Sequence, residues 1–163
     1  MAAATPSRRP QQLQISGRQP KAAVTHHRTC RQSPRWAKSH HGDSYRMGAA
    51  GPHTWDCSSF TQAAYASIGV KMPRTATVQR NLLAAGNGTR IRPGQEKPGD
   101  LIFWDSYLGP NRIGHVMIIW NPANKTTIEA RNTRADVGHF SYANGPSHHI
   151  FEIWRVGNLG GGL

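Results

Sequence analysis

Midway along this chain, helical periodicity gives way to short apolar runs separated by turn residues. Residues 57–68 carry apolar side chains at helical spacing, and a second helical pattern covers about residues 75–84. From residue 98 onward the apolar runs are shorter and are separated by Gly, Pro and Asn, which is typical of strands. Helices that come first and strands that follow predict an α+β fold, with helices on one side of an antiparallel sheet.

The strands are predicted from their apolar content and from the turns between them. We expect strands over residues 101–104, 113–120, 126–130, 140–142 and 150–154. Residues 105–112 are rich in Gly, Pro and Asn and are expected to form a loop, whereas residues 121–124 are expected to form a hairpin turn. Apolar and polar residues alternate in the last strand, which predicts that it is half exposed.

Charge is distributed unevenly along the 163 residues, a length that suffices for one domain. Residues 1–44 contain eight Lys or Arg residues, one acidic residue and very few apolar ones. A segment of this composition cannot bury enough apolar surface to fold. The sequence therefore predicts a basic, disordered tail over residues 1–42, a folded domain over residues 43–157 and a flexible Gly-rich end over residues 158–163.

The formal net charge of +12 predicts a polyanionic partner. Nucleic acid and the anionic polymers of a bacterial envelope both fit this charge. The longest apolar run is far too short to span a bilayer, so no transmembrane segment is expected. The N-terminus lacks the apolar segment of a secretory signal, so we expect no signal peptide and a delivery route other than ordinary export.

One of the two cysteines, Cys57, follows an aromatic-Asp pair and opens the first helical pattern. A thiol at a helix start lies at the positive end of the backbone dipole, which favours the nucleophilic thiolate. Its neighbours Ser58 and Ser59 suit an open site better than a core, although a buried structural cysteine is the alternative. Cys30, in the basic tail, is interpreted as an incidental thiol, because its surroundings lack the four-ligand spacing of a zinc site.

A histidine and a carboxylate follow Cys57 on predicted strands. His115 opens an apolar strand, from which a neutral imidazole can take the proton of a thiol. Glu129 lies on the next strand of the same hairpin, where a carboxylate can hold the second ring nitrogen. The alternatives are an ordinary sheet histidine and a solvent-facing glutamate, with Asn132 or Asp136 as the orienting group. The order of nucleophile, base and orienting group fits a cysteine-histidine hydrolase.

Several short elements occur together in a characteristic order. They are Tyr45-x-x-Gly48, Trp55-Asp56-Cys57-Ser58, Pro73-Arg74-Thr75, Gln79, Pro98-Gly99-Asp100-Leu101-Ile102-Phe103 and His115-Val116. In order and spacing, this set resembles the NlpC/P60 family of cell-wall peptidases. The resemblance covers roughly residues 43–155 and implies a papain-like α+β core, so that residues 43–157 would form an NlpC/P60-like catalytic domain.

The resemblance also implies a substrate and a division of labour in the site. The substrate would be a stem peptide of bacterial peptidoglycan, usually cut between D-γ-glutamate and the diamino acid. Cys57 would be the nucleophile and His115 the base, with the backbone N–H of Cys57 as oxyanion donor. Tyr45, Asp56 and Ser58 would line the substrate groove or bind the free amine of the peptide. Neither a metal ion nor a cofactor is implied.

Two positions depart from the usual pattern of the family. Ser59 stands where glycine is typical, and its side chain is expected to alter the groove beside the nucleophile. Glu129-Ala130 stands where a His-Ala pair is most common, although some members resemble this chain in using a carboxylate. Glu129 is therefore kept as the predicted orienting group, and neither change removes a group that acyl transfer needs.

The hypothesis drawn from these features is a peptidoglycan endopeptidase of the cysteine class. The basic tail and the missing signal suggest a phage endolysin, released from the host cytoplasm through a holin, or a virion-associated lysin. The tail would then hold anionic envelope polymers. One alternative is a cysteine-histidine amidase that cuts the N-acetylmuramoyl-L-alanine bond. Another is a non-catalytic module that binds wall polymer or nucleic acid, whose affinity would fall steeply with salt.

Overall fold

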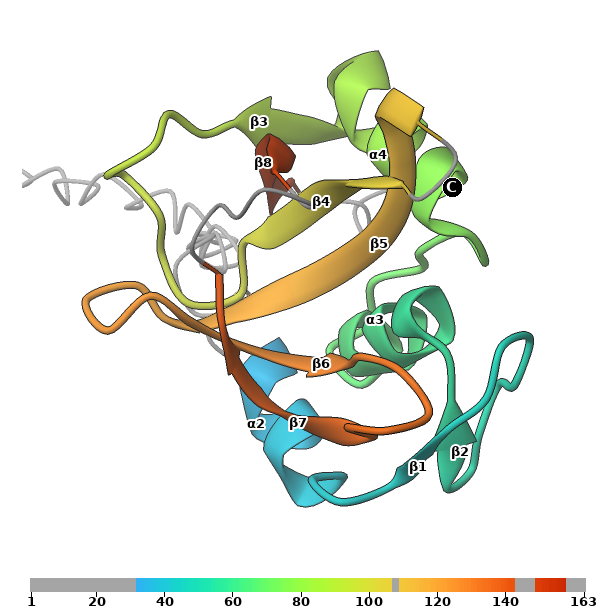
Figure 1. Cartoon of the computed structure of the whole chain (residues 1–163). Helices are drawn as coiled ribbons and strands as arrows, with labels where there is room; N and C mark the ends of the chain where they lie inside the picture. Colours follow the sequence, from blue (N-terminus) through green and yellow to red (C-terminus); the bar gives the residue numbers. More distant parts are fainter. Residues whose placement is uncertain (1–31, 107–108, 143–148, 158–163) are drawn as a thin grey trace, which may run out of the picture.

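The computed structural model of the chain describes residues 32–106, 109–142 and 149–157. A six-stranded antiparallel sheet forms its centre, with the strand order β3-β8-β4-β5-β6-β7 (Figure 1). In chain order the strands are β3 (Gly88–Arg90), β4 (Leu101–Ser106), β5 (Gly109–Asn121), β6 (Thr126–Ala130), β7 (Val137–Ser141) and β8 (Ile150–Val156). The helices are α2 (Ser33–Ser39), α3 (Cys57–Ala66) and α4 (Ala76–Leu82).

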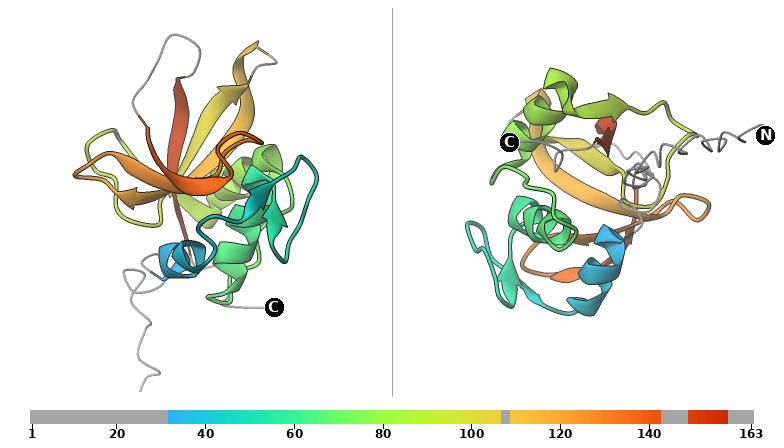
Figure 2. Two further views of the ribbon diagram at one scale, coloured as in Figure 1. Left: turned by 60° about the horizontal axis from the view of Figure 1, so that its bottom comes forward. Right: turned by 180° about the vertical axis from the view of Figure 1, so that it is seen from behind.

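Helices α2 and α3 cover one face of the sheet, as all views show (Figure 2). Helix α3 packs on β5 and β6, and α2 packs on α3 and β6. Phe60 and Ala64 of α3 are fully buried, as their helical spacing predicts. The expected α+β class, with helices on one side of an antiparallel sheet, is confirmed. Among the described helices, none has the length and apolar character needed to cross a membrane.

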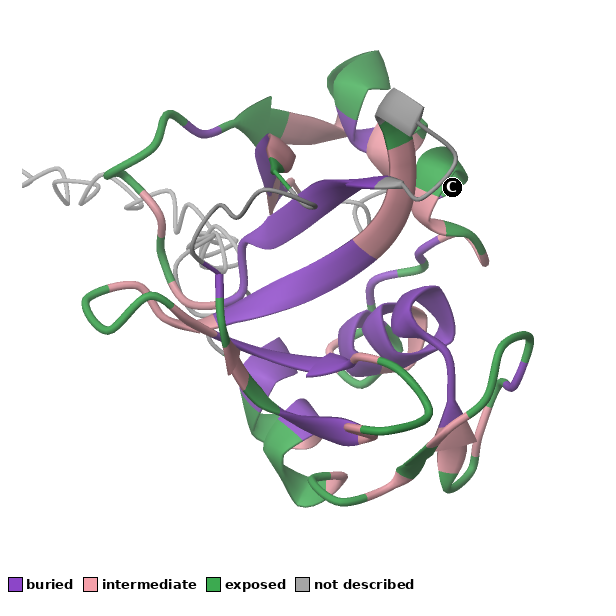
Figure 3. Cartoon of the chain, viewed as in Figure 1, coloured by how far each residue is buried: buried purple, intermediate pink, exposed green. Residues whose placement is uncertain are grey.

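Strand β4 lies inside the sheet between β8 and β5 and is buried on both faces (Figure 3). Leu101 and Phe103 belong to the core under the helices, whereas Ile102 and Trp104 pack in a second apolar cluster on the opposite face. A strand with two covered faces needs a continuous apolar run, which is why this segment does not alternate. The strand predicted over residues 101–104 is thus the start of β4.

A short approach to α3 is built from two small strands. Strands β1 (Ser44–Tyr45) and β2 (Thr54–Trp55) pair in parallel, and the loop between them turns back so that Ala50 bridges to Trp55. Trp55 is 5% exposed and contacts the ring of Phe60 in α3. This packing fixes where the chain enters α3, two residues after Trp55.

The predicted boundary of the basic tail is wrong at its C-terminal end. Residues 33–39 form α2, and Ala37 is fully buried against the core. Trp36 lies 5.5 Å from Phe60 and 5.4 Å from Trp55 by ring centroids, so the helix is stabilised by aromatic packing that local composition does not reveal. Residues 1–31 of the predicted tail, with Cys30, and the predicted Gly-rich end from residue 158 lie outside the described residues.

Three further differences concern strands and turns. The loop expected over residues 105–112 is wrong, because β4 continues to Ser106 and β5 begins at Gly109, with bulges after Trp104 that absorb the shift in register. Strand β8 is more buried than its alternation predicts, because Trp154 and Val156 belong to the core under the helices and Ile153 to the cluster on the opposite face. The second helix is extended by a π-helical turn, η1 (Leu83–Asn87), in which Gly86 has a φ of 105°.

Candidate active site

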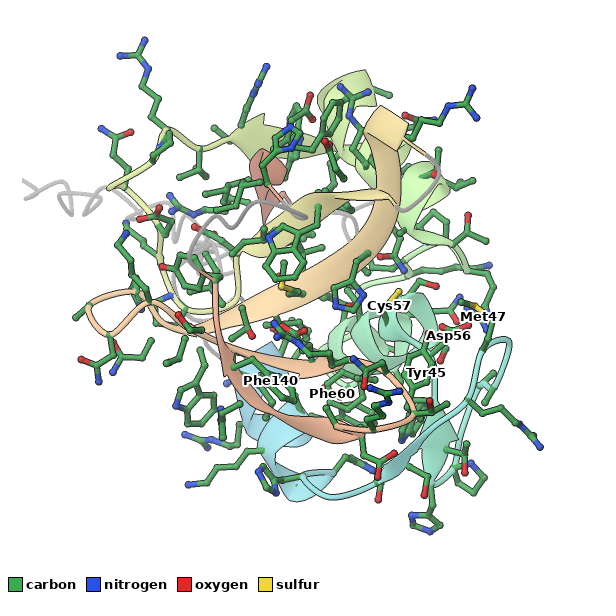
Figure 4. All side chains as sticks on the ribbon, in the orientation of Figure 1. Tyr45, Met47, Asp56, Cys57, Phe60 and Phe140 are labelled. Carbon is green, nitrogen blue, oxygen red and sulfur yellow. The ribbon has the colours of Figure 1, made fainter. Side chains whose placement is uncertain are left out.

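Cys57 is the first residue of α3 and directly follows Asp56 (Figure 4). The helix begins here because the Asp56 side chain accepts a hydrogen bond from the backbone N–H of Ser59, at 2.8 Å. The Ser59 hydroxyl in turn accepts from the backbone N–H of Asp56, at 3.0 Å, which completes a capping box. Cys57 is only 9% exposed, so most of the residue is shielded from water.

Asp56 is held by Arg74 from the segment between α3 and α4. Nη1 of Arg74 donates to Oδ1 at 2.9 Å and Nη2 donates to Oδ2 at 2.7 Å, so the pair is bidentate. The backbone N–H of Gly48 also donates to Oδ2. Burial opposes ionisation of Asp56, but the hydrogen bonds from Arg74 and Ser59 outweigh it and hold the pKa of this carboxyl below its ordinary value. The ionised Asp56 therefore anchors the helix start.

Ser59 does not alter the groove beside Cys57, and that expectation is wrong. The side chain is 2% exposed and its hydroxyl donates to the carbonyl oxygen of Ala49 at 2.6 Å. It points into the turn that precedes α3, where it links the approach loop to the helix.

The other expected substrate-contacting residues lie close to Cys57. Ser58 is 6% exposed; its hydroxyl donates to Asp56 and accepts from Arg74. Gln79 of α4 is fully buried and donates to the carbonyl oxygens of Ser58 and Pro73, which ties α4 to the first turn of α3. The elements around Arg74 and Gln79 that mark the family resemblance thus serve to position the helix start.

His115 lies on β5 and pairs in register with Trp104 of β4, with the two rings 5.9 Å apart. Its Nε2 lies 3.0 Å from Oε1 of Glu129 on β6. This contact engages Nε2, and the imidazole is also hydrogen-bonded with Cys57. The structure thus brings together the three side chains that the sequence singles out, from α3, β5 and β6.

Glu129 is 1% exposed and fully engaged in hydrogen bonds. Oε1 is shared between His115 and Nε of Arg131, the latter at 2.8 Å, and Oε2 accepts from the hydroxyl of Thr127. The alternatives Asn132 and Asp136 lie elsewhere. Oδ1 of Asn132 accepts from backbone groups of its own loop, and Oδ1 of Asp136 accepts from the backbone N–H of Tyr45.

The electrostatics of the pair favour a charged imidazolium. Burial alone would lower the pKa of His115, but hydrogen bonds with Cys57 and Glu129 and the negative charges of both groups raise it to about 10. Burial would likewise raise the pKa of Glu129, whereas the hydrogen bond and charge of His115, the charge of Arg131 and the Thr127 hydroxyl keep it below its ordinary value. Glu129 and His115 are therefore both ionised near neutral pH.

Arg131 is a member of this group that the sequence did not single out. Its guanidinium lies between two rings, 4.2 Å from the centroid of Phe140 and 5.2 Å from that of Trp104. It binds the same carboxylate oxygen as His115. Arg131 comes directly after the end of β6, so the strand pattern predicted from the sequence contains no signal for it.

A cavity of about 770 Å³ lies apart from this group of side chains. Its walls come from β3, β8 and the segment that follows β3, with Tyr142 and Lys125 beside them. Cys57, His115 and Glu129 are not among its lining residues. The candidate site therefore lies where the first turn of α3 packs against the β5–β6 hairpin, and not in this cavity.

Chemically, the group combines a thiol at a helix start, an imidazole and an ionised carboxylate. This is the arrangement that activates a sulfur nucleophile through an oriented base. A comparison with protein families gives a match to the NlpC/P60 family over residues 42–155. The chain belongs to the NlpC/P60 family. The family resemblance inferred from the sequence is confirmed, and so is the papain-like α+β core that it implied.

Bacterial proteins with curated descriptions are among the relatives of this chain. The chain is 41% identical over 78 residues to a probable endopeptidase p60 of Listeria innocua, a match that covers 48% of this chain and 16% of the relative. It is 36% identical over 120 residues to the corresponding protein of Listeria grayi, covering 74% of this chain and 21% of the relative. A gamma-DL-glutamyl hydrolase of Bacillus subtilis is 34% identical over 98 residues, covering 55% of this chain and 22% of the relative. The chain thus spans only about a fifth or less of the length of these proteins.

Solved structures of the family superpose on this fold. NlpC2 from Trichomonas vaginalis matches with a TM-score of 0.67 and 27% identity, over 77% of this chain and 47% of that one. The NlpC/p60 domain of the peptidoglycan hydrolase SagA matches with a TM-score of 0.57 and 28% identity, over 69% of this chain and 88% of that domain. The SagA match shows that most of an isolated family domain is present in this chain.

Proposed function

We propose that this chain is a cysteine peptidase that cleaves stem peptides of bacterial peptidoglycan. The observation that carries the proposal is the His115–Glu129 contact of 3.0 Å, in a pair whose imidazole also bonds the thiol at the start of α3. Such an oriented imidazole is what a sulfur nucleophile needs for acyl transfer. Family membership and the description of relatives as endopeptidases and as a peptidoglycan hydrolase support the substrate class.

The reaction would proceed through a thioester. The Cys57 thiolate attacks the carbonyl carbon of the scissile amide, and the resulting oxyanion is held by the backbone N–H of Cys57, in the first turn of α3, where N–H groups lack intrahelical acceptors. His115 then gives its proton from Nδ1 to the leaving nitrogen as the C–N bond breaks. Neutral His115 next takes a proton from water, whose oxygen attacks the thioester carbon, and the C–S bond breaks to regenerate the thiolate.

Glu129 acts in this scheme without exchanging a proton. It accepts from Nε2 of His115, so that Nδ1 faces Cys57, and its charge stabilises the imidazolium. Arg131 and Thr127 hold the carboxylate in place from its other sides. The chemistry we propose needs only these side chains and water.

We assign the scissile bond to the D-γ-glutamyl–diamino acid linkage. The relative named gamma-DL-glutamyl hydrolase supports a γ-glutamyl bond. Of the residues expected to contact substrate, Tyr45 is half-buried and packs against the core cluster that includes Cys57, and it stays the candidate for direct contact. Asp56 and Ser58 are 4% and 6% exposed and are bound to Arg74, so we assign them a supporting role at the helix start.

We further propose that the basic N-terminal residues carry the enzyme to anionic envelope polymers, as a lysin of phage origin would require. Positions 1–31 contain six Lys or Arg residues and no acidic residue. Replacing these six by Gln should weaken binding to purified cell walls and reduce its dependence on salt. Equal wall binding by both proteins across a salt series would contradict this role.

The test of the activity is mass spectrometry of the soluble products from purified peptidoglycan, with the chain and with Cys57→Ala. New free amines on the diamino acid, absent with the variant, would support the proposed bond. If intact stem peptides are released from the sugar, the activity is that of an N-acetylmuramoyl-L-alanine amidase and not of an endopeptidase. The same absence of products from both proteins on several wall types would overturn the enzyme proposal.

A further inference from the structure

A second group of polar side chains lies where the end of α2 meets the loop that leads into β2. It consists of His40, Asp43 and His53, whose ligand-type atoms all lie within 4.8 Å of one another. His40 is the residue that follows α2, and Asp43 comes after a tight turn. His53 comes from the other side of the β1–β2 pair, so the cluster joins two separate segments.

Each oxygen of the Asp43 carboxylate faces a different imidazole nitrogen. Oδ2 lies 2.7 Å from Nδ1 of His40, and Oδ1 lies 3.7 Å from Nδ1 of His53. Oδ2 also accepts a hydrogen bond from Nε1 of Trp55 at 2.8 Å. A donor of this kind behind a carboxylate fixes its orientation, as the outer partners of metal ligands do.

The His40 ring is held by the aromatic residues around it. Its centroid lies 4.1 Å from that of Trp36 and 5.6 Å from that of Trp55, which it meets edge to face. The His53 side chain is 80% exposed and can adjust its position. Two ligand positions are therefore preorganised by packing, and the third is free to close on a bound ion.

This donor set matches the preferences of zinc. Zinc binds imidazole nitrogen at about 2.0–2.1 Å and carboxylate oxygen at about 2.0–2.2 Å, which places tetrahedral ligand atoms roughly 3.4 Å apart. The three ligand-type atoms already lie within 4.8 Å of one another, and movement of the exposed His53 side chain can bring them to that spacing. We propose that His40, Asp43 and His53 bind a zinc ion, with water as the fourth ligand.

Binding would have a structural consequence rather than a catalytic one. The ion would replace the proton that His40 and Asp43 share and would tie α2 to the loop before β2. That loop enters β2 at Thr54 and Trp55, directly before Asp56 and Cys57. Zinc should therefore stabilise the folded domain and leave the chemistry at Cys57 to the residues already described.

The experiment is calorimetric titration of zinc chloride into a Cys30→Ser/Cys57→Ala chain, because both thiols would otherwise compete for the metal. We expect one zinc ion per chain and a higher Tm with zinc. Adding His53→Ala, an exposed position that does not disturb folding, should weaken binding by about tenfold or more and abolish the rise in Tm.

A matched control is His149→Ala. His149 also pairs with an aspartate, Asp105, at 2.6 Å, but the described structure places no second histidine with that pair. Zinc affinity should be unchanged in this variant. Equal affinity of the parent and His53→Ala chains, or no one-to-one binding at micromolar zinc, would overturn the proposal. Peptidoglycan cleavage by a His53→Ala chain that keeps Cys57 tests the proposed function separately, because that cleavage should persist without zinc.

Discussion

His115 Nε2 lies 3.0 Å from Glu129 Oε1, although the two residues are 14 positions apart in the chain. The β5–β6 hairpin creates this contact. Ile118 pairs with Ile128, so the continued register sets Glu129 opposite Met117, and His115 becomes its diagonal neighbour on the same face. Diagonal neighbours across antiparallel strands are within reach of long side chains, and a glutamate is long enough to bridge them.

Glu129→Gln should move the alkaline limit of activity to lower pH. The pKa of His115 is raised to about 10, in part by the charge of Glu129, and activity falls as the imidazolium loses its proton. Removing the carboxylate charge should shift that limit downward by about 1–3 pH units and lower kcat by about 10²-fold or more. The amide can still accept from His115 and donate to Thr127, so the fold is retained.

The measurement is a pH profile of kcat/KM on a soluble stem-peptide substrate. Glu96→Gln is the matched control, because Glu96 bonds only the backbone of Gly94 among the described contacts. An alkaline limit in Glu129→Gln that coincides with that of the parent and of Glu96→Gln would show that Glu129 does not set the charge of His115.

Arg131→Met should move the acid limit of activity to higher pH. Arg131 binds Oε1 of Glu129, and its charge helps to keep the pKa of that carboxyl below its ordinary value. Without it, Glu129 takes up a proton at a higher pH as the solution is acidified, and His115 loses its charged acceptor. The methionine stem retains contact with Phe140 and Trp104, so packing is largely preserved.

Arg134→Met serves as the comparison, since Arg134 is exposed on the same loop. If the acid limit of activity is the same in both variants, Arg131 does not control the ionisation of Glu129. Arg131→Lys should have an acid limit between those of the parent and of Arg131→Met. The positive charge near Glu129 remains in this variant, but the hydrogen bond from Nε is lost.

Asp56→Asn should destabilise the fold near neutral pH. In acid, the parent and the variant should become similar in stability. The folded-state pKa of Asp56 is below its unfolded value of 3.8, so its contribution is fully present above that value and is lost as pH falls through the folded-state pKa. Asparagine also caps helices well, so the change isolates the charge that binds Arg74. We expect about 1–3 kcal/mol at pH 7, measured by urea unfolding, and a smaller difference near pH 3. A difference that is constant between these pH values would contradict the role of the ion pair.

The helix at Cys57 and the strands of the β5–β6 hairpin were predictable because their signals are local. An aspartate before the helix supplies the cap, and the apolar run of β4 reflects burial on both faces. Strand β3 was not predicted, because Gly-Thr-Arg has no apolar pattern and forms a strand only through its pairing with β8. Helix α2 was missed for a similar reason: Trp36 is stabilised by residues from other segments.

Some residues of the candidate site were likewise predictable from the sequence, and others were not. Cys57, His115 and Glu129 could be selected from residue type and order along the chain. Arg131 could not, because it follows the end of β6, and only its contacts with Glu129 and with the rings of Trp104 and Phe140 show that it belongs to the site. The supporting role that we propose for Asp56 also depends on a tertiary contact, the one with Arg74.

Gly51→Ala should disturb the approach to the active site more than Gly48→Ala does. Both glycines have positive φ, 92° and 82°, so each variant bears backbone strain. At Gly51, however, a Cβ atom would lie 2.5 Å from Cη2 of Trp55, whereas nothing lies within 4 Å of the Cβ at Gly48. Trp55 is 5% exposed and cannot yield easily. We expect a cost of roughly 2–4 kcal/mol at Gly51, from strain and overpacking together, and about 1 kcal/mol at Gly48.

Urea unfolding of the two variants measures this difference, and kcat on a stem peptide measures its consequence. Displacement of Trp55 moves the residues that lead into Asp56 and Cys57, so the Gly51→Ala chain should lose activity beyond what its folded fraction explains. The Gly48→Ala chain should keep its activity, because the backbone N–H of Gly48 still donates to Asp56. If both variants lose equal stability, strain alone accounts for the effect, and the contact with Trp55 does not position the start of α3.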